Sequence, residues 1–388
     1  MQRRNFIRLV GGGVVVAAGL GSLSVYTQSK VPGGAVAAWQ APSPDLDIRR
    51  WVLSYALLAP NPHNLQPWLA DLSLDNQITL RLDPKRRLPA TDPFGRQIMM
   101  GAGAFLELLK MAAAAKGYAV QWQLFPEGYL ADQWDDKPFA RVQLSHNNAL
   151  QADPLFEQVL KRRTDRRAYD PARTVDPSVL QTMQQAINGF PVRLGLSSDP
   201  AQLNQIRHIA REAWRIELTT EAPMMESMHL LRIGRDQIEQ HRDGISITSP
   251  MLVGLSQLGM LDTRQFPAPD SQATQGQLKN FDATTASTPA YFWLVTEGNS
   301  RAVQIEAGRA YVRLNLVGTA LGLAMHPNEQ ALQEYPEVQK QYKAIHDLLQ
   351  APSPTFTVQM LARIGYLPVG TPWQEPAPRR GLAAHLTV

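Results

Sequence analysis

The densest group of chemically active side chains lies between Lys161 and Arg167, where five of seven residues are basic. Guanidinium groups form paired hydrogen bonds with phosphate oxygens, and the hydroxyl of Thr164 would add a short donor. Five charges are too few for a nucleic-acid footprint. The stretch therefore predicts a pocket for one phosphate, with a solvated basic surface as the alternative.

A second group lies in the loop from Leu58 to Trp68, which contains two asparagines, one glutamine and three prolines. Prolines hold an irregular backbone, and carboxamides supply both donors and acceptors, so such a loop could contact a planar heterocycle. The alternative is a proline-rich helix terminator.

A third group follows the sequence Arg363-Ile364-Gly365-Tyr366-Leu367-Pro368, where a proline-stiffened tail carries Arg379 and Arg380. This tail could bring two more arginines to a shared anion site. Taken alone, it is equally well a surface tail.

Several common catalytic motifs are absent from the sequence. It contains no G-x-G-x-x-G, no Walker-type loop and no G-x-S-x-G, which argues against a dinucleotide Rossmann domain, a P-loop and a serine hydrolase. The eight histidines form no H-x-x-x-H pair, so we expect no metal site. The absence of cysteine excludes disulfides, thiolate metal sites and cysteine nucleophiles.

The pattern of apolar residues predicts an α+β layer architecture. A linker (38–44) precedes a first half (45–150) and a second half (151–388). The expected helices span 45–59, 101–116, 155–162, 177–188, 302–323 and 334–349, with two or three more between Pro200 and Leu261. The expected strands span 68–74, 78–82, 120–125, 140–144, 192–196, 290–295 and 357–364. The polar stretch 262–288 is expected to be a lid or a surface excursion.

The N-terminus explains the overall charge of +4. Residues 1–37 carry Arg3, Arg4, Arg8 and Lys30 and no acidic residue; removing these four leaves 34 basic residues against 34 acidic ones. The adjacent arginines, an uncharged run from Leu9 and the later Ala35-Val36-Ala37 resemble a twin-arginine export signal with a cleavage site. We therefore expect a periplasmic or exported protein, carried by the twin-arginine machinery with its cofactor already bound. An uncleaved membrane tether is the alternative.

Together these segments resemble the FMN-dependent nitroreductase superfamily, in particular its Acg-like branch with two fused halves. The resemblance covers the chain from about Asp45 onward and rests on Ala59-Pro60 with Asn64-Leu65-Gln66-Pro67-Trp68, and on Arg162-Arg163-Thr164-Asp165-Arg166. It implies two related halves, each with a small, mostly antiparallel sheet flanked by helices. They would form an intramolecular pseudo-dimer, so that one monomer builds one FMN site.

The resemblance also implies which residues bind FMN. They are Arg162, Arg163, Thr164 and Arg166 with Arg379 or Arg380 for the phosphate, and Pro60, Asn61, Asn64, Gln66, Asn280, Pro327, Asn328 and Glu329 near the ring. Gln330 stands where the family usually has glycine, and this departs from its pattern of backbone contact with the flavin. No side chain is expected to act as a nucleophile or general base.

Three functions follow from these observations. The first is an FMN oxidoreductase that passes electrons to a flat electrophile, such as a nitroaromatic or a quinone, with NADH or NADPH as candidate reductants. The second is a catalytically weak protein that sequesters flavin under the 262–288 segment. The third is a binding or structural protein without flavin.

Overall fold

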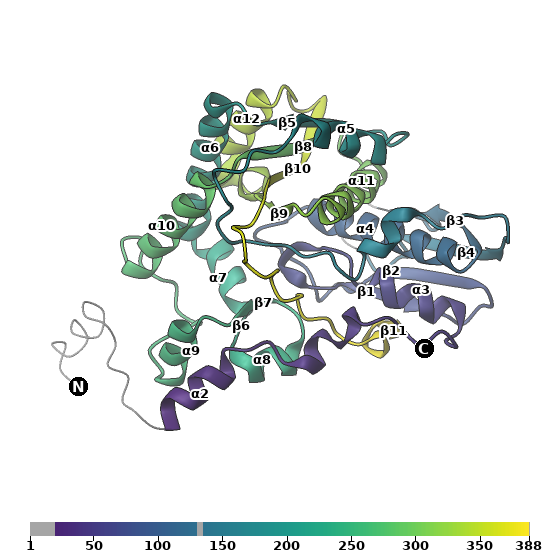
Figure 1. The fold of residues 1–388 in the computed structure, drawn as a ribbon, viewed down its shortest axis with the longest axis horizontal. Helices are drawn as coiled ribbons and strands as arrows, with labels where there is room; N and C mark the ends of the chain where they lie inside the picture. Colours follow the sequence, from purple (N-terminus) through teal and green to yellow (C-terminus); the bar gives the residue numbers. More distant parts are fainter. Residues whose placement is uncertain (1–19, 130–134, 388) are drawn as a thin grey trace.

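The computed structural model describes residues 20–129 and 135–387, which form two sheets with helices packed between and around them (Figure 1). The first sheet has the strand order β11-β1-β2-β4-β3, and all its pairs except β1 with β11 are antiparallel. Its strands are β1 (Trp68–Asp71), β2 (Gln77–Leu82), β3 (Tyr118–Leu124), β4 (Ala140–His146) and β11 (Leu386–Thr387). Helices α3 (Ile48–Ala56) and α4 (Arg96–Ala115) belong to the same half.

The second sheet has the order β5-β8-β10-β9 and is antiparallel throughout. Its strands are β5 (Arg193–Ser197), β8 (Ala290–Glu297), β9 (Ala324–Pro327) and β10 (Phe356–Gly365). The helices of this half are α5 (Pro177–Ala186), α6 (Pro200–Thr219), α10 (Gln272–Ala286), α11 (Arg301–Ala320) and α12 (Gln339–Leu348). The predicted α+β class, with two halves each built on a mostly antiparallel sheet, is confirmed.

Helices α4 and α11 cross between the two sheets and hold the halves together (Figure 1). A Cβ on Gly103 would lie 2.0 Å from the carbonyl oxygen of Ile305, and a Cβ on Gly308 would lie 1.9 Å from that of Met100. Each helix has 20 residues, and the eighth residue of each packs on the fifth residue of the other. Only glycine permits this approach, and its reciprocity is what a pseudo-dimer axis through the crossing requires.

Helix α4 is also long and apolar enough to cross a membrane by length and composition alone. Most of its surface is buried in the protein, however, and Phe105, Leu106 and Leu108 are fully enclosed. It is therefore the central helix of the first core.

An insertion in the second half lies on one side of the molecule, next to the N-terminal segment (Figure 1). It comprises α7 (Glu221–His229), β6 (Leu231–Ile233), α8 (Gly234–His241), β7 (Ile245–Ile247) and α9 (Pro250–Gln257). Helix α2 (Leu20–Gln28) packs against α8 and α9, and the 3₁₀ helix η1 (Gly33–Trp39) follows it. The predicted export signal thus falls partly outside the described residues, and its described part packs on the protein; cleavage stays a prediction.

Two segments differ from the sequence-based expectation. The stretch 262–288 contains an ordered helix, α10, whose Ser271 N-cap accepts from the amide of Thr274. Arg207 on α6 donates to the carbonyls of Thr285 and Thr288, so the segment packs on the second half. The stretch 155–162 forms only the short 3₁₀ helix η3 (Pro154–Gln158), because it begins at a proline and leads directly into the irregular arginine segment.

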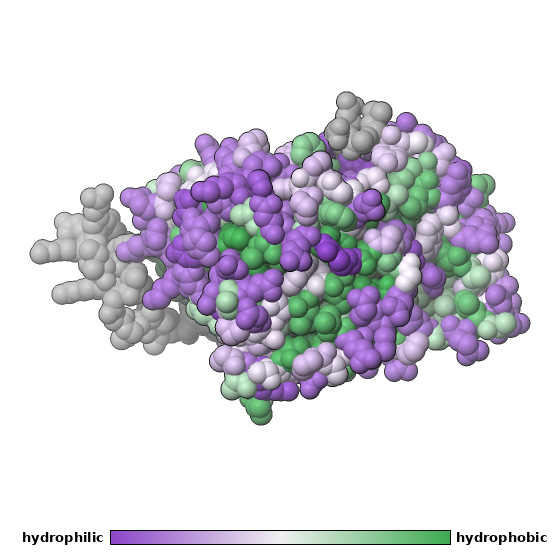
Figure 2. All heavy atoms as spheres, turned by 90° about the horizontal axis from the view of Figure 1, so that it is seen from above, coloured by the Kyte–Doolittle hydropathy of each residue, from purple (hydrophilic) through white to green (hydrophobic). Residues whose placement is uncertain are grey.

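The surface is mixed in character. Viewed from the top of Figure 1, hydrophilic residues cover much of both halves, with apolar residues exposed in the middle of the face (Figure 2). The tail from Pro376 to Thr387 returns to the first half, where Leu386 pairs with Ala70.

Candidate functional site

The three segments singled out in the sequence meet at the end of helix α3. Arg162 Nη2 donates to the carbonyl oxygen of Leu58 (2.9 Å), and Arg379 Nη2 donates to the same oxygen (3.1 Å). Arg379 Nε also reaches the carbonyl of Leu57 (2.9 Å). The last carbonyls of a helix lack intrahelical partners and carry partial negative charge, so guanidinium groups gather there.

Arg162, Arg163 and Arg379 form a group of positive charges that we call the anion cluster. Among the described residues, no carboxylate lies within ion-pair distance of these three guanidiniums. Burial lowers the pKa of Arg162 to about 10, with a smaller effect from Arg163. Burial, followed by repulsion from Arg162 and Arg163, lowers the pKa of Arg379 well below its usual value. The lowered pKa values show that these buried positive charges have no paired counter-ion among the described residues, so a bound anion would stabilise them.

Arg162 shows where that charge would bind. Its side chain is 3% exposed, and its Nε and Nη1 are buried without a hydrogen-bond partner. Buried donors of this kind are rare in folded proteins because each carries a desolvation penalty. Arg163 lies beside it and is half-buried; within the described part of the chain, its guanidinium donates hydrogen bonds to the carbonyls of Leu160 and Arg162. Phosphate oxygens would satisfy these donors, so the cluster fits the phosphate of FMN.

The loop at residues 60–66 is held in an unusual backbone conformation. His63, Asn64 and Gln66 all have positive φ angles, of 47°, 53° and 51°. Three left-handed non-glycine residues in one loop store strain, which concentrates at functional sites.

The carboxamides of this loop are engaged by the protein itself, which differs from the expectation that they face a ring. Asn61 Oδ1 accepts from the amide of Gln66 (2.8 Å). Asn64 binds Arg379 Nη1 (2.6 Å) and the carbonyl of Pro378 (2.9 Å). Gln66, fully buried, accepts from the amide of Arg380 (2.9 Å) and donates to the carbonyl of Arg242 (2.9 Å). These side chains hold the loop, the tail and the insertion in register, with Pro60 preceding them.

Arg380 adds a second attachment between the tail and the loop. Its guanidinium donates to the carbonyl of Gln66, and its Nε is buried without a partner. Burial, then the nearby charge of Arg86, lowers its pKa to about 10.

Strand β9 lies against the other side of the arginine segment. The amide of Asp165 donates to the carbonyl of Met325 (3.0 Å). Arg166 is solvent-exposed, and the desolvation of its guanidinium by the surrounding protein lowers its pKa. Its charge lowers the pKa of His63 on the loop after the larger effect of burial, and that of His326 on β9 after the larger effects of burial and of Arg363. Arg166 is therefore near enough to both the loop and β9 to act on them electrostatically.

His63 was not predicted from the sequence, and it is the titratable side chain of the loop. Its Nε2 lies 3.3 Å from Ser227 Oγ on helix α7, and Ser227 Oγ donates to Glu217 Oε1 (3.4 Å). Burial raises the pKa of Glu217 to about 7, although donors from Gln333 and Ser227 oppose this. His63, Ser227 and Glu217 come together because the insertion that carries Ser227 folds against the loop. Their spacing in the sequence could not indicate this contact.

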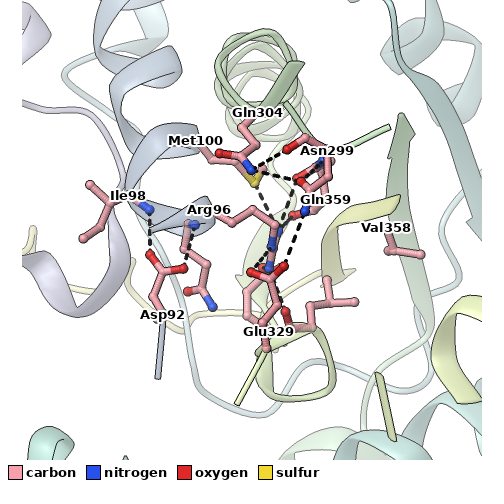
Figure 3. A network of polar contacts seen from close by, with 12 residues as sticks. Asp92, Arg96, Ile98, Met100, Asn299, Gln304, Glu329, Val358 and Gln359 are labelled. Carbon is pink, nitrogen blue, oxygen red and sulfur yellow. Dashed lines mark hydrogen bonds and ion pairs between the residues drawn. The ribbon is translucent and has the colours of Figure 1, made fainter. Parts of the chain in front are cut away.

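Glu329 faces inward rather than toward the arginine segment. Figure 3 shows Arg96 reaching from α4 to Glu329 and Gln359 in the second half. Arg96 Nη1 donates to the carbonyl of Gln359 (2.6 Å), Nη2 to that of Leu332 (3.0 Å), and Glu329 Oε1 accepts from the amide of Leu361 (3.0 Å). Burial disfavours the charge on Arg96, but Glu334, Glu329 and Asp92 outweigh it and raise its pKa. This network joins the two halves.

The remaining predicted residues make fewer contacts with the arginine segment and the loop. Pro327 ends β9, and the neighbouring Asn328 is buried with its Oδ1 lacking a partner. Thr164 is half-buried beside Arg163. The side chain of Asn280 is exposed on α10, and no contact brings it to the arginine segment.

A second arginine cluster lies on the other side of α11, and we call it the neutral cluster. Arg309 binds Glu107 (3.0 Å) and Glu306 (2.8 Å), and Arg313 binds Glu107 (2.9 Å) and Asp153 (2.7 Å). Arg313 Nε also donates to the carbonyl of Ala186, the last residue of α5. Phe190, which follows α5, lies 5.0 Å from the Arg309 guanidinium, so the place of a reciprocal loop is filled by paired charges and an aromatic ring.

Cavities and metal ligands do not indicate another centre. Two concavities in the described part of the chain are lined by Phe139 and Arg301, and by Asn299 and Glu334; neither includes the anion cluster. Within residues 20–129 and 135–387, no three His, Asp or Glu side chains converge to hold a metal ion.

Relatives with known descriptions match most of the chain. No family model matches it. A protein named "Putative NAD(P)H nitroreductase" from Mycobacterium tuberculosis H37Rv is 27% identical over 357 residues, covering 91% of this chain and 95% of the relative. The acg protein of that strain, with the same description, is 30% identical over 47% of this chain and 50% of its own length. These relatives support the nitroreductase-superfamily resemblance of the sequence.

Solved structures give a weaker similarity. The FMN-dependent nitroreductase NfnB from Mycobacterium smegmatis, in complex with NADPH, is 18% identical with a TM-score of 0.36, covering 59% of this chain and 94% of that one. A Bacteroides fragilis nitroreductase with bound FMN is 13% identical with a TM-score of 0.36, covering 59% of this chain and 97% of that one.

Proposed function

We propose that this chain is an FMN-dependent oxidoreductase of the nitroreductase type. The observation that carries the proposal is the anion cluster: Arg162 is buried with two unsatisfied donors, and no carboxylate of the described residues forms an ion pair with the three arginines. The names of the relatives, which span nearly the whole chain, support the same function.

Arg162 and Arg163, with Thr164 beside them, would hold the cofactor phosphate, and Arg379 would add positive charge behind them. A bound flavin supplies the electron transfer in such a site. Arg166, near both the strained loop and β9, would place a positive charge where the ring takes up negative charge. Asn61, Asn64 and Gln66 position the loop through the tail.

The substrate we propose is a flat electrophile, such as a nitroaromatic or a quinone, with NADH or NADPH as reductant. We further propose a monomer that acts as a pseudo-dimer with one site, because the neutral cluster fills the reciprocal place. Export through the twin-arginine machinery is the accompanying proposal for location.

The test starts with the absorbance spectrum of the purified full chain and identification of the released chromophore. The holoprotein is then mixed anaerobically with NADPH or NADH, and flavin bleaching is followed. Bleaching, followed by reoxidation on addition of a quinone, supports the reductase. A colourless protein that does not take up added FMN contradicts the proposal.

A second candidate is a flavin-sequestering protein with little turnover. The nearly complete burial of Arg162 and Arg379 favours it, because it indicates a closed phosphate end. A yellow protein whose flavin is bleached by dithionite but by neither nicotinamide nucleotide would support this function instead.

A further inference from the structure

The segment Gly33–Trp39 lies directly against the anion cluster. The carbonyl oxygen of Ala35 accepts from the backbone amide of Arg379 (2.8 Å), and Ala35 is fully buried. Trp39 Nε1 donates to the carbonyl of Ala377 (2.8 Å), and its side chain is 7% exposed. Two hydrogen bonds, between residues 338 and 344 positions apart in the sequence, thus attach this segment to the tail that carries Arg379.

The Trp39 indole ring faces all three guanidiniums of the cluster. The ring centroid lies 5.4 Å from the guanidinium carbon of Arg162, 4.8 Å from that of Arg163 and 5.1 Å from that of Arg379. The face of an indole ring carries partial negative charge and attracts cations at such distances. No carboxylate of the described residues forms an ion pair with the cluster, although the charge of Glu375 acts on Arg163 from a longer distance. This ring, together with the carbonyls of Leu57 and Leu58, therefore offsets the mutual repulsion of the three arginines.

We propose that Trp39 is a positioning residue of the phosphate pocket, and that Gly33–Trp39 closes the pocket against solvent. The ring holds the guanidiniums together, so that their free donors are oriented for a phosphate before it arrives. This proposal deepens the proposed function and rests on it. The proposal has a specific consequence. Trp39 affects the affinity for ligands that carry a phosphate, and it does not affect the affinity for the rest of the flavin.

A purely structural role for Trp39 makes a different prediction. Trp39 also belongs to the buried hydrophobic cluster of the first half, which includes Trp51 and Val52. If packing were its whole role, its loss would lower stability and would weaken the binding of FMN and of riboflavin, which lacks the phosphate, by equal factors.

The experiment compares full-length wild type with Trp39→Leu and Trp39→Phe, with Trp373→Leu as the matched control because Trp373 is half-exposed on the same tail. The FMN dissociation rate is measured by fluorescence recovery after dilution, and the affinities of FMN and riboflavin are measured by titration. We expect Trp39→Leu to weaken FMN by about 10-fold and riboflavin by less than twofold. Trp39→Phe should restore part of the difference, and Trp373→Leu should resemble wild type.

Equal losses for FMN and riboflavin, or unchanged FMN retention in Trp39→Leu, would overturn the proposal. A chain that binds no flavin would refute the proposed function, and the pocket is then tested with inorganic phosphate alone. In that case, wild type and Trp39→Phe should gain thermal stability from phosphate, and Trp39→Leu should not. If phosphate stabilises all three proteins equally, or none of them, Trp39 is not a positioning residue of the pocket.

Discussion

The anion cluster and the neutral cluster place the same residue type at equivalent positions with opposite electrostatics. In each, an arginine binds the carbonyls at the end of the helix that precedes the first strand of a half: Arg379 at Leu57, and Arg313 at Ala186. The neutral cluster surrounds its two arginines with three carboxylates. Among the residues that the structure describes, no carboxylate forms an ion pair with the anion cluster, and Glu375 acts on Arg163 only from a longer distance. In the proposed pseudo-dimer, this difference is the reason for assigning the ligand site to the anion cluster and a structural role to the neutral cluster.

The pKa values of Arg162 and Arg313, one arginine from each cluster, shift in opposite directions. Burial lowers the pKa of Arg162 to about 10. Burial acts against the charge of Arg313 as well, but Asp153 and Glu107 outweigh it and raise the pKa. An arginine that is buried without a counter-charge is costly to the free protein, so a bound anion would stabilise it.

The largest effect is expected from Glu107→Ala, which removes the carboxylate that Arg309 and Arg313 share. Glu107 is 1% exposed and binds both arginines, so its loss leaves a buried donor of each guanidinium without its charged partner. We expect a loss of about 3 kcal/mol in unfolding free energy, measured by urea denaturation. Asp282→Asn, which breaks an exposed pair with Arg211, should cost less than about 1 kcal/mol. Equal costs for the two variants would show that the neutral cluster does not depend on pairing.

The second effect concerns Arg162→Ala, which removes the arginine with free donors. Loss of a charge-assisted bond costs about 1.5–3 kcal/mol, so FMN affinity should fall by about 10- to 150-fold. The stability of the flavin-free protein should stay the same or increase, because a repulsive charge is gone. Arg313→Ala is the control: it should lower stability and leave FMN affinity within about threefold in the protein that remains folded. The reverse pattern would assign the two clusters the opposite roles.

A third effect separates phosphate binding from flavin binding. Inorganic phosphate should raise the melting temperature of the flavin-free wild type, in proportion to the logarithm of its concentration above Kd. The shift should disappear in Arg162→Ala and persist in Glu107→Gln. Chloride at matched ionic strength controls for screening, and a shift of the same size with chloride would argue against a site.

The smallest expected effect is on the pH dependence of stability, and it comes from Glu217, a buried carboxyl group. Burial raises the pKa of Glu217 to about 7, from 4.5. The folded state therefore holds this proton more tightly, and the contribution to stability is full below pH 4.5 and is lost as the pH rises toward 7. Between pH 5 and 8 the melting temperature of wild type should fall by about 3 °C more than that of Glu217→Gln. Parallel curves for the two proteins would show that Glu217 ionises normally.

Local sequence patterns predicted the elements that are periodic or capped. Asp47 caps α3 and Asp176 caps α5 through bonds to the first backbone amides, within or beside the helices expected at 45–59 and 177–188. The strands expected at 68–74 and 78–82 pair as the antiparallel strands β1 and β2. The meeting of the loop, the arginine segment and the tail followed from motif resemblance, since nothing in their spacing places them together.

Features that depend on one particular contact escaped prediction, whether the partner is near in the sequence or distant. Helix α4 begins at Arg96, five residues before the expected start, because Asp92 accepts from the amides of Gln97 and Ile98. Strand β11 has two residues and exists only through its pairing with β1. The engagement of Asn64 and Gln66 by the tail, and the place of Trp39, arise from residues more than 120 positions apart, which no local pattern encodes.

The burial of Ala35 bears on the order of events if the chain is exported. A peptidase needs an accessible, extended backbone, and Ala35 has no exposed surface and a carbonyl bonded to Arg379. In a chain that folds before it crosses the membrane, cutting after Ala37 would have to wait for local opening of this segment. The rate of maturation would then report the opening rate, and a ligand that tightens the pocket would slow it. The rate at which the leader is cleaved would in that case be lower for protein with a bound ligand than for protein with an empty site.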